Sequence, residues 1–88
     1  MIYNLIYTAE ARQDIRQILD DVATASGSVW LADRYVNDLL TKLEERTLFP
    51  HSGTPLYYQE KFTGYYPLIF KAYMAFYRVT DDSMEVVR

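Results

Sequence analysis

Apolar and polar positions alternate with helical spacing in two stretches of the first half of the chain. The first stretch follows Thr8, a residue type that caps helix N-termini, and it ends near Ser26-Gly27. Its inner stripe consists of Ala11, Ile15, Ile18 and Val22. The second stretch follows Ser28 and ends before Pro50. Its inner stripe consists of Ala32, Val36, Leu39 and Leu43. The short joint containing glycine predicts that the two helices form an antiparallel hairpin.

Runs of branched and aromatic residues predict strands on both sides of this hairpin. One strand precedes it at residues 2–7, and we expect that strand to be buried on both faces. Three strands follow it, at residues 65–70, 73–79 and 84–87. Pro67 places the first of these at a strand start or a sheet edge. The predicted fold is α+β with the order β-α-α-β-β-β, in which a helical hairpin packs on a mostly antiparallel sheet. All 88 residues form a single domain, because neither half could bury a core alone.

Composition adds that this domain must fold without covalent staples. The chain has no Cys, and 16% of its residues are aromatic, with ten of the fourteen aromatics in residues 49–88. The net charge of −3 lies entirely in residues 1–48, which hold five Lys/Arg and eight Asp/Glu. An acidic balance argues against an extended basic surface for nucleic acid. Neither a membrane span nor a secretory signal is expected, which predicts a cytoplasmic protein.

Candidate chemistry is sparse, and no cofactor or metal is expected. His51 is the only His, and Asp20-Asp21 and Asp81-Asp82 lack the pattern of a calcium loop. The remaining candidates for catalysis are the basic residues of the second half, Lys61, Lys71, Arg78 and Arg88. Such residues on a sheet could stabilise the charge of a phosphate during metal-independent RNA cleavage. The alternative is that they are solvated strand positions that prevent edge pairing.

Several runs together resemble the RelE/ParE family of toxins from type II toxin–antitoxin systems. The resemblance begins at Tyr7-Thr8-Ala9-Glu10-Ala11-Arg12-Gln13-Asp14-Ile15 and continues through Pro50-His51-Ser52-Gly53-Thr54-Pro55. It is strongest at Tyr73-Met74-Ala75-Phe76-Tyr77-Arg78-Val79, which is similar to the Tyr-x-x-Phe-Tyr-x-Val strand of the family. It implies a toxin that a small cognate antitoxin inactivates within a hetero-oligomer. RelE-like members cut mRNA on the ribosome, whereas ParE-like members act on DNA gyrase.

Three features depart from the family pattern. No basic residue follows Gly64-Tyr65 in the stretch where members usually carry an Arg, and the chain is acidic. The sequence ends at Arg88, where many members continue with further basic residues. If the last strand has little to follow it, we expect its edge of the sheet to be open to an antitoxin strand.

The resemblance leaves three hypotheses for function. The first is RelE-like, ribosome-dependent mRNA cleavage in which the four basic residues converge on one face. The second is ParE-like inhibition of gyrase without nuclease activity. The third is a degenerate homologue that keeps only antitoxin binding, through Trp30, Tyr35 and the outer faces of the helices. Most aromatics are expected in the core, leaving a minority for a target or an antitoxin. The candidates for that minority are Tyr57, Tyr58 and Tyr66.

Overall fold

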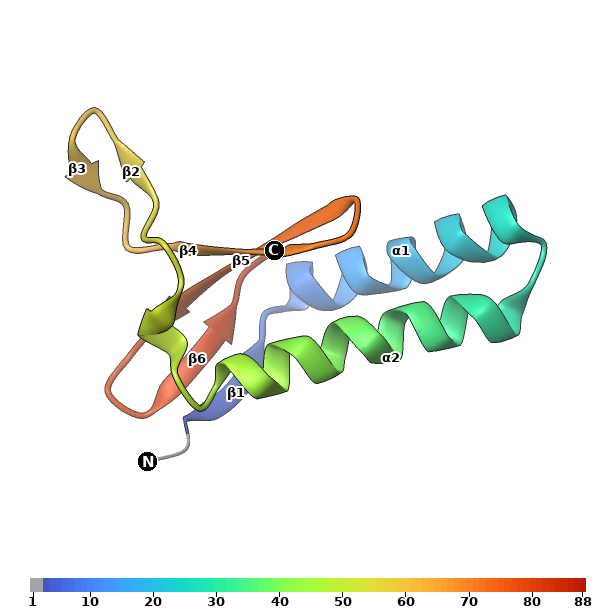
Figure 1. Ribbon diagram of the computed structural model, residues 1–88, viewed down its shortest axis with the longest axis horizontal. Coiled ribbons are helices and arrows are strands. Elements are labelled where there is room, and N and C mark those ends of the chain that lie inside the picture. The colour runs from blue at the N-terminus through green and yellow to red at the C-terminus, as the bar shows by residue number, and fades with distance from the viewer. Residues whose placement is uncertain (1–2) are drawn as a thin grey trace.

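The computed structural model describes residues 3–88 and confirms the α+β fold with a helical hairpin on a mostly antiparallel sheet (Figure 1). The helices are α1 (Ala9–Ser26) and α2 (Val29–Arg46), and a short 3-10 turn, η1 (Pro50–Ser52), follows them. The strands are β1 (Asn4–Tyr7), β2 (Tyr57–Tyr58), β3 (Lys61–Phe62), β4 (Tyr66–Phe70), β5 (Tyr73–Val79) and β6 (Ser83–Val86). The main sheet has the order β1-β6-β5-β4, and β2 and β3 form a separate hairpin.

Both predicted helix caps are present. The Thr8 hydroxyl accepts a hydrogen bond from the Ala11 N–H at 3.1 Å, and the Ser28 hydroxyl accepts one from the Leu31 N–H at 3.2 Å. Each bond satisfies an N–H group that the first helical turn leaves without a partner. Gly27 ends α1 with a φ of 69°, a left-handed conformation that glycine adopts without strain. These residues therefore set the length of both helices and the turn between them.

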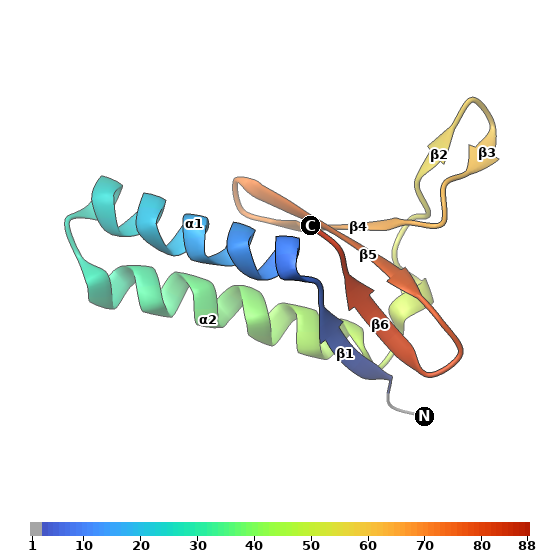
Figure 2. The ribbon, with the colours of Figure 1, turned by 180° about the vertical axis from the view of Figure 1, so that it is seen from behind.

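The core lies between the helical hairpin and one face of the sheet. Tyr77 and Leu43 are fully buried at its centre, where β5 meets α2. The other fully buried large side chains are Leu68, Met84 and Val86, from β4 and β6. Figure 2, the view from behind, shows the two helices running side by side and extending past the sheet. Burial of aromatic and aliphatic area is the source of stability that a small, Cys-free domain requires.

Two expectations about the strands need correction, and the structure adds one element that the sequence pattern did not predict. β1 is an edge strand paired in parallel with β6 alone, so Ile6 is exposed rather than buried. The last strand, β6, lies inside the sheet between β1 and β5, so it is not the open edge. The hairpin of β2 and β3 was not predicted, because each strand has only two residues and both are exposed. Pro67 does lie in an edge strand, as expected from its missing N–H group.

Candidate binding groove

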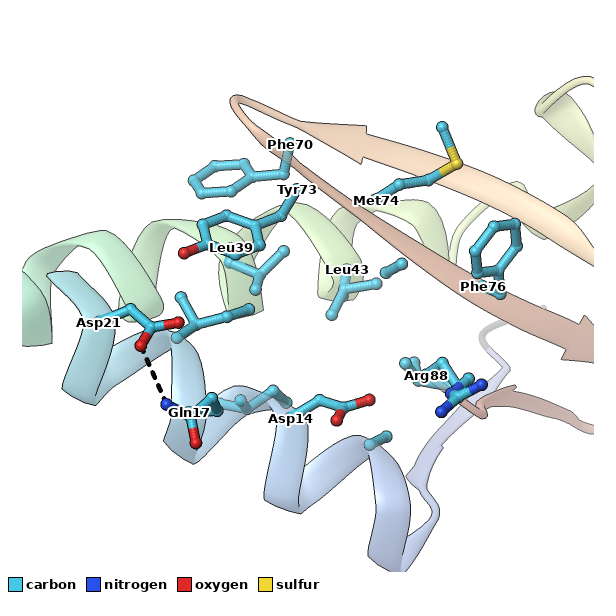
Figure 3. A pocket seen from close by; sticks show the side chains of 15 residues that line it. Asp14, Gln17, Asp21, Leu39, Leu43, Phe70, Tyr73, Met74, Phe76 and Arg88 are labelled. Atoms are coloured by element: carbon cyan, nitrogen blue, oxygen red, sulfur yellow. Dashed lines mark hydrogen bonds between the residues drawn. The ribbon is translucent and has the colours of Figure 1, made fainter.

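An open apolar groove runs between α1 and β5 (Figure 3). Its volume is about 430 Å³. Ile15 and Ile18 of α1 form one wall, and Tyr73 and Met74 of β5 form the other. Leu39 and Leu43 of α2 form the floor, together with Phe70 at the end of β4. The side chains that line it are mostly hydrophobic, as in sites that bind apolar ligands or amphipathic helices.

The groove lies beside the N-terminal part of β5, which β6 does not pair with. Val87 and Arg88 both lie opposite Phe76, whose N–H donates to the Arg88 carbonyl at 2.8 Å and whose carbonyl accepts from the Val87 N–H at 2.9 Å. Two residues opposite one form a β-bulge, which bends the strand and ends regular pairing. In the described part of the chain, residues 73–75 of β5 therefore pair with β4 on one side only. The side of β5 that faces α1 is left open there.

Charged groups stand at the rim of this groove. Asp14 and Asp21 lie along the α1 side, and the Gln17 amide donates to the Asp21 carboxylate at 2.9 Å. Arg88 lies at the opposite end from Asp21 (Figure 3). Burial first, and the negative charge of Asp21 second, raise the pKa of the Tyr73 hydroxyl above its ordinary value. The rim is thus acidic along one wall and basic at one end.

The structure places the four basic candidates on different surfaces. Lys61 is exposed on the β2–β3 hairpin, which is a separate two-stranded sheet. Lys71 occupies the two-residue turn between β4 and β5 with a φ of 52°, and its ammonium lies 4.5 Å from the centre of the Tyr35 ring. That contact is a cation–π interaction, which gives Lys71 a structural partner.

Arg78 lies on β5, and the backbone of Arg88 bonds to Phe76 of the same strand. The Arg78 guanidinium donates to the Glu85 carboxylate at 2.7 Å across β5 and β6. Arg78 and Arg88 border neighbouring hollows that share Tyr65 and Val87. Lys61 and Lys71 line neither of these hollows. Arg78 and Arg88 thus line adjacent hollows, and Arg78 is already paired with the Glu85 carboxylate.

The proline-glycine loop that contributed to the resemblance has a structural explanation. The buried Tyr77 hydroxyl donates to the Pro50 carbonyl at 2.7 Å and accepts from the Arg46 guanidinium at 3.1 Å. A Cβ atom on Gly53 would lie 2.6 Å from that guanidinium nitrogen. A larger residue at position 53 would therefore displace the end of the Arg46 side chain. This network anchors η1 to the core.

Other singled-out residues fall into two groups. Trp30 is 66% exposed near the start of α2 and Tyr58 is 70% exposed on the β2–β3 hairpin, so both are accessible. Tyr66 is buried, which corrects the expectation that it is available to a partner.

His51 contacts the Tyr66 hydroxyl at 3.0 Å through its Nδ1 atom. Among residues 3–88, no group of three or more His, Asp or Glu side chains is arranged to hold a metal ion.

The groove was not found from the sequence. The helical spacing predicts the inner stripe of α1 but does not indicate how much of it is buried. Only the pairing of β5 with β6 shows that part of the α1 stripe has no strand opposite it. One signal was available: Met74 and Phe76 alternate with Tyr73, Ala75 and Tyr77, so β5 is apolar on both faces.

In residues 3–88, neither helix is long and apolar enough to cross a membrane.

Comparison with known proteins identifies the family of this chain. Residues 5–88 match the family described as the ParE toxin of type II toxin-antitoxin system, parDE. Among solved structures, the chain is similar to one titled "Chromosomal ParDE TA system from P. aeruginosa", with a TM-score of 0.80 and 19% sequence identity. That alignment covers 99% of this chain and 92% of the other. A search of curated proteins gives no match. The family match extends over nearly the whole sequence, and the chain therefore belongs to the ParE toxins of type II toxin–antitoxin systems.

Proposed function

We propose that this toxin inhibits DNA gyrase by binding to it, and that a cognate antitoxin neutralises the toxin by filling the groove between α1 and β5. The groove is the observation that carries the antitoxin part of the proposal. The family match supports gyrase over the ribosome, because ParE-like members act on gyrase whereas RelE-like members cut mRNA. Since gyrase acts on the chromosome, the proposal places the toxin in the bacterial cytoplasm.

The placement of the basic residues supports binding over RNA cleavage. Metal-independent cleavage needs cationic groups that converge on the reacting phosphate. Lys71 is directed onto the Tyr35 ring and Arg78 onto the Glu85 carboxylate, while Lys61 stands on a separate hairpin. RelE-like mRNA cleavage is the first hypothesis from the sequence. It would require Lys71 and Arg78 to leave these partners. A toxin that binds a protein target needs no such convergence.

The chemistry of the groove supports an amphipathic helix as the antitoxin segment. A groove with an apolar floor takes anchors at helical spacing, such as positions i, i+3, i+4 and i+7. The carboxylates of Asp14 and Asp21 favour basic residues on the antitoxin along the α1 wall. Arg88 favours an acidic residue at the other end of the groove. We therefore expect an antitoxin helix with an apolar face flanked by charges of both signs.

The target is tested with purified toxin in two reactions run side by side. We expect the toxin to block supercoiling by gyrase, because the proposal makes gyrase its binding partner. We expect mRNA to remain intact in a translation reaction that contains the same toxin concentration. Cleaved mRNA together with normal supercoiling would overturn the proposal in favour of the RelE-like alternative.

The groove is tested separately with the antitoxin candidate encoded by the neighbouring gene. Ile18→Asp places a charge on the apolar wall, and we expect it to weaken antitoxin binding at least roughly tenfold, or about 1.4 kcal/mol. Trp30→Asp is the matched control, because Trp30 is exposed on α2 outside the groove. Calorimetric titration measures both affinities. If Trp30→Asp weakens binding and Ile18→Asp does not, the antitoxin covers the outer helical faces instead.

A further inference from the structure

The β2–β3 hairpin projects from the body of the toxin at the end opposite the turn between the helices (Figure 1). We call residues 57–62 the aromatic finger. It carries three aromatic side chains, of which Tyr57 is 60% exposed, Tyr58 is 70% exposed and Phe62 is 47% exposed. Large exposed aromatic side chains on a projecting hairpin are unusual, because an isolated two-stranded hairpin buries little apolar area.

The tip of the finger has a demanding backbone conformation. Gln59 and Glu60 form its two-residue loop, with φ angles of 51° and 65°. Hairpin loops with positive φ at both positions normally contain Asn-Gly or Asp-Gly, because other residues are strained there. Strained backbone of this kind persists only where the surrounding structure holds it, and it concentrates at functional sites.

A row of aromatic contacts holds one face of the finger to the core. The Tyr57 and Phe62 rings lie 5.8 Å apart, and the Phe62 ring lies 5.6 Å from that of Tyr66. Tyr66 in turn stacks on the buried Tyr77 at 5.4 Å. At the base of the finger, the Thr63 N–H donates to the Leu56 carbonyl at 3.0 Å. The finger is therefore preorganised by the core rather than free to collapse.

The opposite face of the finger presents Tyr58 and Lys61, which pair across the two strands. Glu60 and Lys61 cancel in charge, so the finger is neutral. A neutral surface does not attract the phosphates of nucleic acid, which select for clustered Lys and Arg. Exposed Tyr side chains held in place by packing are instead typical of anchors in protein interfaces, where they enter pockets on a partner.

We infer that the aromatic finger is the surface with which the toxin binds its protein target, and that Tyr58 enters an apolar pocket whose rim carries a carboxylate for Lys61. The inference rests on the proposed function for the identity of the target, but the finger itself is separate from the antitoxin groove. An antitoxin in the groove then blocks the target by its bulk rather than by covering Tyr58. The projecting shape requires a concave site on the target.

The test uses Tyr58→Ala in a toxin whose loop has been changed by Gln59→Asn and Glu60→Gly. The Asn-Gly loop suits the positive φ angles and keeps the hairpin formed, so that a lost effect cannot come from its collapse. Trp30→Ala in the same background is the matched control, because Trp30 is similarly exposed but lies on α2. Three quantities are measured for each protein: growth arrest on expression without antitoxin, the toxin concentration that half-inhibits gyrase, and affinity for the neighbouring-gene antitoxin candidate.

We expect Tyr58→Ala to raise the half-inhibiting concentration at least roughly tenfold and to relieve growth arrest, as removal of an interface anchor does. Antitoxin affinity should stay within about twofold of the background, and Trp30→Ala should change none of the three quantities. Equal gyrase inhibition by Tyr58→Ala and its background would overturn the inference and leave the proposed function standing. Equal losses of inhibition and antitoxin affinity would also overturn it. The toxin with the Asn-Gly loop could arrest growth without inhibiting gyrase, and Tyr58→Ala could relieve that arrest. This result would support the aromatic finger as the target-binding surface and would show that gyrase is not the target.

Discussion

The two helices match closely in sequence pattern but differ in how much of that pattern they bury. Each has 18 residues, a side-chain N-cap and an apolar stripe at helical spacing. The stripe of α2 is buried throughout, at Ala32, Val36, Leu39 and Leu43. The stripe of α1 is buried only at Ala11, and Ile15, Ile18 and Val22 are half-exposed. Amphipathic spacing therefore predicts which face of a helix seeks a partner, but not whether the partner belongs to the same chain.

The difference has its origin in the sheet. Leu39 and Leu43 of α2 belong to the same buried cluster as Leu68, Tyr77 and Met84 of the sheet. α1 lies beside the part of β5 that β6 does not reach. Under our proposal, a second molecule covers this apolar area on α1, and its burial contributes to binding rather than to folding. The same physical preference for burial thus serves stability in one helix and, under our proposal, recognition in the other.

Truncation of one side chain from each stripe gives the largest expected contrast. Leu43→Ala empties a site that is 1% exposed, and it should lower the free energy of unfolding by roughly 2–5 kcal/mol. Ile18→Ala removes a half-exposed side chain, and it should lower that free energy by only about 1 kcal/mol. Urea unfolding of the free toxin measures both values. Equal losses would mean that the groove is closed in solution and that α1 is core in the same way as α2.

Removal of the helix caps should give a smaller contrast between the same two helices. Ser28→Ala deletes one hydrogen bond to the first turn of α2 and should cost about 1 kcal/mol. Thr8→Ala should cost more, up to about 2 kcal/mol, because the Thr8 hydroxyl also donates to the Val87 carbonyl at 3.1 Å. Thr41→Ala, at an exposed position of α2, is the control and should leave the midpoint of thermal unfolding within a degree or so. A smaller loss for Thr8→Ala than for Ser28→Ala would show that its bond to Val87 does not stabilise the fold.

The elements that could be predicted from the sequence are those determined by neighbouring residues. Thr8, Ser28 and Gly27 act on the turn next to them, so both helices were predicted within a residue or two. The turn at Lys71-Ala72 was also predicted from its position between two apolar runs. The hairpin of β2 and β3 was missed because Gln59-Glu60 lacks the Asn or Gly that signals such a loop.

What could not be predicted depends on pairing between distant segments. β1 was expected to be buried on both faces, but its parallel pairing with β6, 79 residues later, makes it an edge. The register of β5 with β6 also determines the partner of Arg78, because it places Glu85 directly opposite. The groove depends on that same register. No sequence motif signals such a groove, because its lining consists of ordinary apolar residues.

The smallest expected effect is a change in how the free energy of unfolding depends on pH in the alkaline range. It arises from two tyrosines that lie near different helices. Burial, with the charge of Glu44 on α2, raises the pKa of Tyr7, and burial, with the charge of Asp21 on α1, raises that of Tyr73. Since the folded state then holds the phenol proton more tightly, both residues contribute stability below the ordinary tyrosine pKa of about 10, and this contribution is lost as pH rises through the folded pKa. Free energies of unfolding measured between about pH 9 and 11 should therefore fall more gently in Tyr7→Phe and in Tyr73→Phe than in the parent.

Antitoxin binding should separate the two tyrosines. Tyr73 lines the groove, so an antitoxin helix would desolvate it further and move its ultraviolet-detected titration to higher pH. Tyr7 lies in β1 on the other side of the core and does not line the groove, so its titration should stay where it is. Difference spectra of the parent, Tyr7→Phe and Tyr73→Phe, each with and without antitoxin, assign the shift to one residue. A shift that survives in Tyr73→Phe but disappears in Tyr7→Phe would place the antitoxin against β1, and α1 would then keep its half-exposed stripe in the complex.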